Sequence, residues 1–215
     1  MRLVSSYYHD HWPFESFDWV SSIASSDQAS DLEKGDVLLV WGGADIHPSL
    51  YNKKHSPQSG AWGSKPSKRD MVEWTMMKRA VELGIPIIGV CRGAQMLCAL
   101  AGGYLMQHIT GHAGPNHLVV TNDGQEFVVN SLHHQMMVPA NTNHTVLARS
   151  KTRLSSVYWD EEKTVDHNDE PELIIFNDIK GFAVQWHPEM MAPNCEATLY
   201  IKEALEKHLD LVRID

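Results

Sequence analysis

Cys91 stands where an apolar run meets a glycine-rich turn, in the sequence GVCRG at residues 89–93. Residues 86–90 are typical of a buried strand, and the pattern after Cys91 is helical. Small flanking residues permit a tight turn on which a nucleophilic side chain stands clear of the backbone. The N–H groups and dipole of the following helix would favour the reactive thiolate. A buried structural cysteine beside two glycines would look similar, so this segment alone does not decide between the two.

A base and an orienting carboxylate occur in the sequence QWHPE at residues 185–189, after a second apolar run. In an extended chain, His187 and Glu189 project to the same side. A carboxylate placed there can fix the tautomer of the histidine and stabilise its protonated form. The alternative is a solvent-facing loop histidine beside an unrelated acid. Taken together, Cys91, His187 and Glu189 predict the catalytic triad of a cysteine-dependent acyl-transfer enzyme.

Paired glycines follow a third apolar run, in the sequence WGGAD at residues 41–45. Without side chains, the backbone N–H groups of such a segment can approach a ligand closely. An oxyanion hole needs donors of this kind, aimed where negative charge develops. An ordinary turn at the end of a strand would have the same composition, so Gly42 and Gly43 are weak evidence by themselves.

The elements that must position these residues are short buried strands alternating with amphipathic helices. Continuous apolar runs at residues 37–41, 86–90, 173–176 and 182–185 favour central parallel strands. Residues 70–83 form a helical pattern with Met71, Trp74, Met77 and Val81 on one stripe, and residues 194–212 form another, with apolar Leu199. This order predicts an α/β fold, a three-layer sandwich with a mostly parallel central sheet flanked by helices.

Two regions are less regular. Residues 124–170 are expected to form antiparallel strands in an excursion from the sheet or at its edge, and residues 9–35 a helix with room for one strand. No linker or repeat divides the chain, so a single domain over residues 1–215 is expected.

Taken in order, the motifs resemble those of class I glutamine amidotransferases, and more narrowly those of the γ-glutamyl-γ-aminobutyrate hydrolase-like (peptidase C26) branch. The resemblance extends from about residue 37 to about residue 190. It rests on GGADIHPSLY at 42–51, Arg69-Asp70 at a helix start, GVCRGAQ at 89–95, GGYLMQHI at 102–109, VNSLHHQ at 129–135 and QWHPE at 185–189.

The resemblance implies the flavodoxin-like fold of this superfamily and a role for each matching residue. Cys91 would be the nucleophile, His187 its general base and Glu189 the residue that orients the base. The oxyanion hole would be formed by the N–H groups of Gly43 and Arg92. The glutamyl group of the substrate would be bound by Gln95, by the backbone of Ser131 and Leu132, and beside His133, with Gln135 near the same pocket.

The implied reaction is hydrolysis of a γ-glutamyl amide through a γ-glutamyl thioester, without a cofactor or metal. Two residues near the pocket depart from the family pattern: Trp41 stands in place of a proline, and His134 in place of a small residue. These departures leave the identity of the amine half of the substrate undecided. One alternative is a glutaminase subunit that delivers ammonia to a synthetase partner. Such subunits tend to carry a Gly-Gly-Pro-Gly loop and a hydrophobic residue after the nucleophile, so Ala44, Asp45 and Arg92 favour the hydrolase. The other alternative is a catalytically silent binding module of the same fold.

Composition narrows the partners and the compartment. The net charge is −9 and the 18 lysines and arginines are scattered, which argues against nucleic-acid or membrane partners. The resemblance implies a small-molecule γ-glutamyl substrate, and a homo-oligomer is a further possibility. Three cysteines form no disulfide framework and no signal peptide is visible, so a cytoplasmic protein is expected.

The 13 histidines raise the question of a metal. The candidate clusters are His9 with His11, and His108 with His112 and His117. Neither has the compact spacing of a known ligand motif with cysteine or carboxylate partners, so no metal site is expected. His108 and His117 are expected to lie beside the pocket, and Cys98 in the core.

Overall fold

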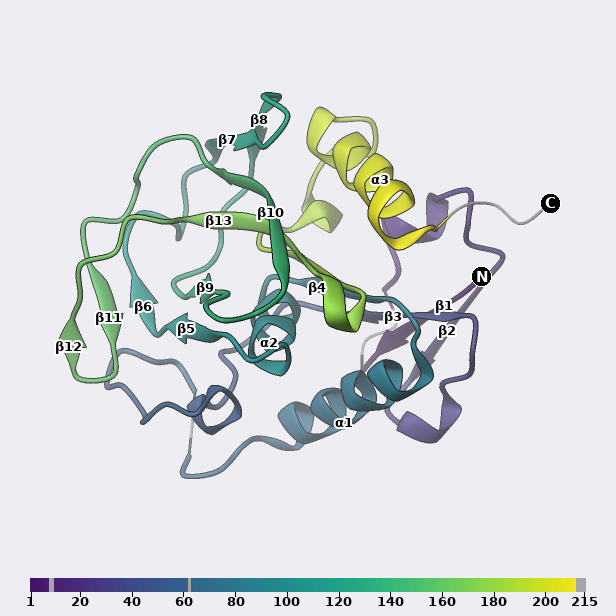
Figure 1. The fold of residues 1–215 in the computed structure, drawn as a ribbon, viewed down its shortest axis with the longest axis horizontal. Helices are drawn as coiled ribbons and strands as arrows, with labels where there is room; N and C mark the ends of the chain where they lie inside the picture. The colour runs from purple at the N-terminus through teal and green to yellow at the C-terminus, as the bar shows by residue number, and fades with distance from the viewer. Residues whose placement is uncertain (8–9, 62, 212–215) are drawn as a thin grey trace.

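The computed structural model describes residues 1–7, 10–61 and 63–211, and its centre is a nine-stranded sheet (Figure 1). The strand order is β2-β1-β3-β4-β14-β13-β10-β7-β8. These strands are β1 (Arg2–Ser6), β2 (Ser22–Ser26), β3 (Asp36–Val40), β4 (Ile87–Val90), β7 (His117–Thr121), β8 (Glu126–Val129), β10 (His144–Ser150), β13 (Pro171–Phe176) and β14 (Gly181–Val184).

The sheet has a parallel half and an antiparallel half. Strands β2, β1, β3, β4 and β14 are parallel to their neighbours in that order. From β14 onward, β13, β10, β7 and β8 pair antiparallel. The apolar run at residues 173–176 is therefore a central strand, as its composition predicted, but it is antiparallel to both neighbours. Every residue of β13 is buried, which explains why it reads like a parallel strand.

Helices cover both faces of the sheet (Figure 1). Helices α1 (Lys68–Leu83) and α2 (Arg92–Leu100) pack on one face, where Met76, Met77 and Leu97 meet Leu38 and Ile87. Helix α3 (Glu196–Leu209) packs on the other face with the alternate strand residues, including Leu39 and Ile88. The predicted three-layer arrangement is confirmed.

The predicted core-facing stripe of α1 is confirmed at Met77, which is fully buried, and at Trp74 and Val81, which pack against the core, but not at Met71. Met71 is 49% exposed, whereas Glu73, Met76 and Ala80 are fully buried. Glu73 is buried with its carboxylate paired to Arg69 and Arg92, as described below. The predicted start at residue 70 is two residues late, since Ser67 and Asp70 form a capping box around the start of the helix.

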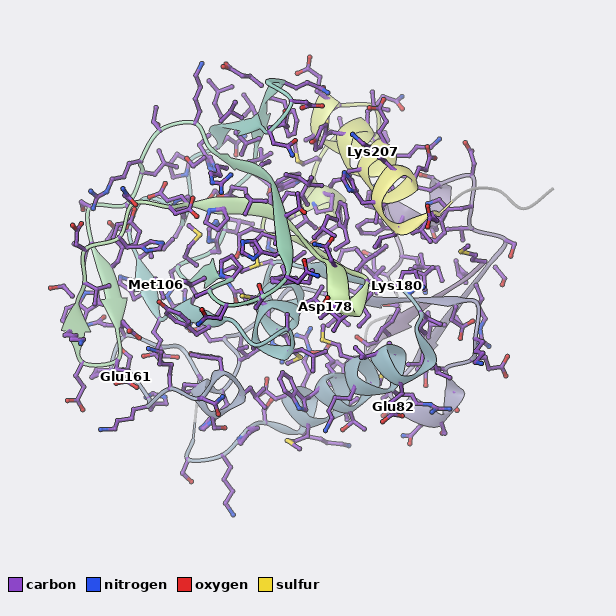
Figure 2. The ribbon with its side chains drawn as sticks, viewed as in Figure 1. Glu82, Met106, Glu161, Asp178, Lys180 and Lys207 are labelled. Carbon is purple, nitrogen blue, oxygen red and sulfur yellow. The ribbon has the colours of Figure 1, made fainter. Side chains whose placement is uncertain are left out.

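The second predicted helix, residues 194–212, is shorter in the structure: it begins after Cys195, which is extended, and ends before Asp210, which adopts a left-handed conformation. Residue 212 lies outside the described residues. Leu199, which was placed among its apolar positions, is 46% exposed. Charged side chains such as Lys207 on α3 and Glu82 on α1 project into solvent (Figure 2).

The expected helix near the N-terminus is absent from the described residues between 10 and 35. This segment contains β2 and two short 3₁₀ helices, Phe14–Ser16 and Ala29–Asp31. Hydrogen-bonding serines and aspartates in the segment favour turns over a continuous α-helix. Of the two histidines considered as a metal-binding pair and rejected, His9 lies outside the described residues.

The excursion expected within residues 124–170 is present, and parts of it begin earlier in the chain. Beside β8 and β10, it contains a three-stranded sheet in the order β12-β11-β6 and a two-stranded sheet β5-β9. These strands are β5 (Tyr104–Met106), β6 (His108–Ile109), β9 (Met136–Val138), β11 (Tyr158–Asp160) and β12 (Lys163–Thr164). The side chain of Met106 is buried, and Glu161 lies in the turn between β11 and β12 (Figure 2). None of the helices described is long and apolar enough to cross a membrane.

Candidate active site

Cys91 occupies a strained turn between β4 and α2. Its backbone has φ +50° and ψ −106°, a conformation that costs free energy in a residue with a side chain. The neighbouring glycines make the turn possible: a Cβ on Gly89 would lie 2.5 Å from the carbonyl oxygen of Gly93, and a Cβ on Gly93 would lie 2.1 Å from that of Val40. The predicted elbow is present, with the cysteine at its tip.

His187 and Glu189 follow the neighbouring strand β14. Because β14 is parallel to β4, with Val184 beside Val90, both motifs leave the sheet at the same edge. The Nδ1 atom of His187 lies 2.6 Å from Oε1 of Glu189. This contact holds the ring so that the other nitrogen, Nε2, can serve as the base.

Asn130 fixes the backbone of His187. Its side-chain amide donates to the carbonyl oxygen of His187 at 2.7 Å and accepts from the N–H of His187 at 2.8 Å. The sequence reasoning did not assign a role to Asn130, although it precedes Ser131 in the VNSLHHQ stretch. Its position next to a residue already singled out was the only available signal.

The glycine loop after β3 completes the group. A Cβ on Gly42 would lie 2.7 Å from Cε1 of His187 and 3.4 Å from Cβ of Cys91. Burial acts to lower the pKa of His187. The contacts with Cys91 and Glu189 act in the opposite direction and together outweigh burial, so the pKa is raised to about 10. At neutral pH the histidine is therefore a cation between the sulfur of Cys91 and the carboxylate of Glu189.

Arg92 provides only its backbone at this site, because its guanidinium is buried elsewhere. The side chain pairs with Asp70 at 2.5 Å and with Glu73 of α1. Glu73 also accepts from Nε of Arg69 at 3.1 Å. Arg69 in turn donates to the carbonyl oxygens of Trp41 and Gly42, at 3.0 and 2.9 Å.

This ionic network connects both sides of the expected oxyanion hole. Through Glu73 it joins the first residue of α2 to the loop that carries Gly43. A Cβ on Gly43 would lie 3.6 Å from Cδ of Arg92, so the two residues are neighbours. Sequence reasoning singled out Arg69 and Asp70 as part of a motif but missed Glu73, whose charge within an apolar stripe was a usable signal.

Of the four residues expected to bind the glutamyl group, three side chains are buried and one is exposed. Gln95 donates long hydrogen bonds to Gln185 and to the carbonyl oxygen of Gln135, both at 3.4 Å. Ser131 donates from its hydroxyl to the carbonyl oxygen of His112, and Leu132 is 51% exposed. His133 is buried among other histidines around Glu172, away from solvent.

Two hollows flank the group. One, of about 220 Å³, is lined by Asp10, Trp41, Gly42, His187, Glu189 and Met190. The other, of about 120 Å³, lies on the side of Ala44, Asp45 and Arg92. His134, on that side, places Nε2 3.0 Å from Oδ1 of Asp45, and this contact raises the pKa of the histidine.

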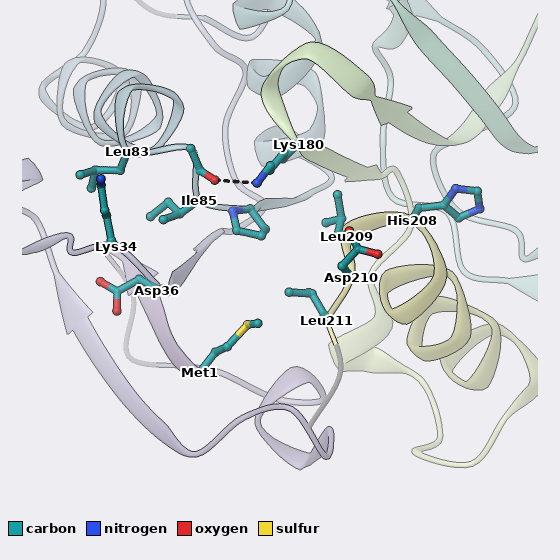
Figure 3. A pocket seen from close by; sticks show the side chains of 13 residues that line it. Met1, Lys34, Asp36, Leu83, Ile85, Lys180, His208, Leu209, Asp210 and Leu211 are labelled. Atoms are coloured by element: carbon teal, nitrogen blue, oxygen red, sulfur yellow. Dashed lines mark hydrogen bonds between the residues drawn. The ribbon is translucent and has the colours of Figure 1, made fainter. Parts of the chain in front are cut away.

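A larger cavity, of about 430 Å³, lies at the other end of the strands (Figure 3). Asp36, Pro86 and Lys180, which line it, stand at or just before the starts of β3, β4 and β14, whereas the catalytic candidates follow the ends of β4 and β14. Lys180 is held there by a hydrogen bond to the carbonyl oxygen of Gly84 at 3.0 Å. This cavity is therefore remote from Cys91.

Known structures share this fold. A GMP synthase protein from Thermoplasma acidophilum superposes with a TM-score of 0.62 at 15% identity, over 98% of this chain and 93% of that one. At this identity the likeness establishes the fold alone, which is the class I glutamine amidotransferase fold.

The family model for peptidase C26 matches residues 20–168, and the chain belongs to this family. Relatives include the glutamine amidotransferase-like protein YvdE of Lactococcus lactis, 28% identical over 72% of this chain, and the γ-glutamyl-γ-aminobutyrate hydrolase of Escherichia coli O157:H7, 25% identical over 74%. These matches cover only 66% and 65% of the relatives' own lengths.

Proposed function

We propose that this protein hydrolyses a γ-glutamyl amide through a γ-glutamyl thioester on Cys91. The observation that carries the proposal is the convergence of Cys91, His187 and Glu189 at one edge of the sheet, with the glycine loop against them. Membership of the peptidase C26 family supports the same chemistry.

In the first half-reaction, the Cys91 thiolate attacks the γ-carbonyl carbon and a C–S bond forms. The oxyanion of the tetrahedral intermediate accepts hydrogen bonds from the N–H groups of Gly43 and Arg92. As the intermediate collapses, the C–N bond breaks and the protonated His187 gives its proton to the departing amine. The thioester and a neutral His187 remain.

In the second half-reaction, His187 takes a proton from water and the hydroxide attacks the thioester carbon. The C–S bond breaks, glutamate leaves and the thiolate is restored beside a protonated His187. Glu189 keeps the ring oriented in both steps, since its carboxylate contacts Nδ1 throughout.

The glutamyl group would lie between α2 and the segment after β8. Gln95 is one turn beyond Cys91, and its side chain contacts Gln135 in that segment. Asn130 ties the start of the segment to His187, so the backbone of Ser131 and Leu132 lies beside the reacting centre. The amine would leave past Asp45 and His134, which form a polar wall on one side.

The experiment is glutamate release from a panel of γ-glutamyl amines, γ-glutamyl peptides and free glutamine. Wild type, Cys91→Ala and Cys195→Ala would be compared, because Cys195 is a half-buried cysteine outside the site. We expect release from at least one amide by wild type and Cys195→Ala, and a loss of several orders of magnitude in Cys91→Ala. Equal release by all three proteins would contradict the proposal.

The glutaminase alternative draws on the match to the carbamoyl phosphate synthase small chain of Polynucleobacter asymbioticus, which is 28% identical over 44% of this chain. It predicts ammonia release from glutamine only, and only when a synthetase partner is added. If the protein hydrolyses no amide, with or without a synthetase partner, the result would favour the second alternative, a catalytically silent binding module.

A further inference from the structure

Four buried side chains converge behind the proposed glutamyl pocket, although they come from distant parts of the sequence. They are His112 before β7, His117 on β7, His133 between β8 and β9, and Glu172 on β13. All four are less than a tenth exposed, and Glu172 is completely buried. The proposed hydrolysis uses neither Glu172 nor the rings of His112 and His117.

The distances from Glu172 to the three histidine rings match those between ligands around one ion. Oε1 of Glu172 lies 3.3 Å from Nδ1 of His112, 3.3 Å from Nε2 of His117 and 3.5 Å from Nε2 of His133. Zinc bound tetrahedrally at about 2.0–2.1 Å holds its ligand atoms about 3.3–3.4 Å apart. Ligand atoms of His112, His133 and Glu172 all lie within 4.8 Å of one another.

None of these atoms makes a hydrogen bond of acceptable geometry within the described residues. Both oxygens of Glu172, Nδ1 of His112 and Nε2 of His133 are buried without a hydrogen-bond partner. Buried polar atoms are rarely left in this state, because each one loses its interaction with water. A bound cation would satisfy the carboxylate and the ring nitrogens together.

The outer contacts also match a metal site. Ligating histidines usually present their second ring nitrogen to a carboxylate or a backbone carbonyl. Nδ1 of His133 lies 2.9 Å from the carbonyl oxygen of Gln135, within hydrogen-bond geometry. Nε2 of His112 lies 3.1 Å from Oε2 of Glu170, close enough for an ion pair but without the geometry of a hydrogen bond. Glu170 itself accepts from Tyr158 and from the N–H groups of Leu154 and Ser155, so it is held in place as an outer carboxylate.

We propose that His112, His133 and Glu172 bind a divalent transition-metal ion, with His117 as the nearest fourth donor. Imidazole and carboxylate donors in this number suit Zn²⁺. The burial of all of these side chains away from water favours a structural role over a catalytic one. This goes beyond the proposed hydrolysis and runs against the expectation from sequence spacing, which did not include Glu172 or His133. An imidazolium ion on His112 would also balance the charge of Glu172, and the experiment below separates the two.

The ion would stabilise the segments that border the proposed substrate pocket. Ser131 donates its hydroxyl hydrogen bond to the carbonyl oxygen of His112. The backbone of Glu172 accepts from the N–H of Gln185, two residues before His187. A metal here would therefore join the excursion strands to both segments that border the catalytic group.

The test is Zn²⁺ binding by the full chain after removal of metal with a chelator, measured by competition with a chromogenic chelator. Variants His112→Gln and His133→Gln remove proposed ligands, and His208→Gln is the matched control, since His208 is an exposed histidine on α3. Cys91→Ser tests whether zinc binds at the catalytic cysteine instead. Folding of each variant is checked by circular dichroism.

We expect one tightly bound Zn²⁺ per chain in wild type, His208→Gln and Cys91→Ser, with a rise in the unfolding temperature. Affinity should fall at least about tenfold in His112→Gln and His133→Gln. Equal binding by all variants, loss in Cys91→Ser alone, or no tight binding would overturn the proposal. If the histidine variants do not fold, X-ray absorption of zinc on wild type decides: imidazole and oxygen neighbours support the site, and a sulfur neighbour overturns it.

Discussion

Only one of the three cysteines has the surroundings of a nucleophile. Cys91 stands at the tip of the elbow, in contact with a cationic histidine. Cys98 is fully buried, and burial raises the pKa of its thiol to about 12, so it stays protonated and unreactive. The proposed chemistry therefore depends on Cys91 and on the charge of His187.

The charge of His187 should set the alkaline limit of activity. The active form needs a protonated His187, and its pKa of about 10 means that kcat/KM should decline as the pH rises through that value. Glu189→Gln removes one of the two partners that raise this pKa, so the decline should begin at lower pH. The measurement is kcat/KM as a function of pH for both proteins.

Direct titration provides the control. The Cε1 proton of His187, followed by NMR, should titrate at a lower pH in Glu189→Gln and also in Cys91→Ala, which removes the other partner. A titration that does not move in either variant would rule out this account of the histidine.

At the scale of elements, α1 supports the site through one buried carboxylate. Glu73 is fully buried between Arg92 and Arg69 and also accepts from Ser6. Replacing it by glutamine leaves two arginines with reduced compensation. We expect Glu73→Gln to lower the free energy of unfolding by about 3–5 kcal/mol, and to lower activity because Arg69 holds the glycine loop.

The matched control is Glu82→Gln on the same helix. Glu82 is exposed and pairs with Arg79 at the surface, so its loss should cost less than about 1 kcal/mol. Denaturant unfolding of both variants measures the difference. Similar costs for the two would show that the buried network does not stabilise the fold.

The close approach of α2 to β3 depends on Gly93. A methyl group there would meet the carbonyl oxygen of Val40 at 2.1 Å, and backbone cannot give way cheaply. We expect Gly93→Ala to destabilise the protein severely or to prevent folding. Gly84→Ala is the control, because Gly84 has φ +68° but open space around it, and its cost should be about 1–2 kcal/mol. Thermal unfolding compares the two, and a Gly93→Ala protein as stable as Gly84→Ala would contradict the packing argument.

At the scale of the whole molecule, the sequence predicted the central strands and the sheet edge where the three candidate motifs meet, because both depend on local patterns. Strands β3, β4 and β14 are continuous apolar runs, and each is followed by a motif with its own chemistry. Parallel pairing then brings the three motifs to one edge. This much can be inferred without coordinates.

What could not be predicted depends on pairing between distant segments. The direction of β13 is set by its neighbours. Because β13 is buried on both faces, its sequence has no polar–apolar alternation that would distinguish an antiparallel strand from a parallel one. Glu172, His112 and His133 meet only because β7 and β13 join the same sheet through β10. Asn130 and Glu73 likewise gain their roles from partners 57 and 19 residues away.

The central claim is that Cys91 reacts with the γ-carbon of a glutamyl group, and active-site labelling tests it most directly. Wild type, Cys91→Ala and Cys195→Ala would be treated with a diazoketone analogue of glutamine, and the adduct located by peptide mass spectrometry. We predict one adduct per chain at Cys91 in wild type and Cys195→Ala, slowed by excess substrate, and none in Cys91→Ala. No adduct in wild type, or an adduct at another residue that persists in Cys91→Ala, would contradict the account.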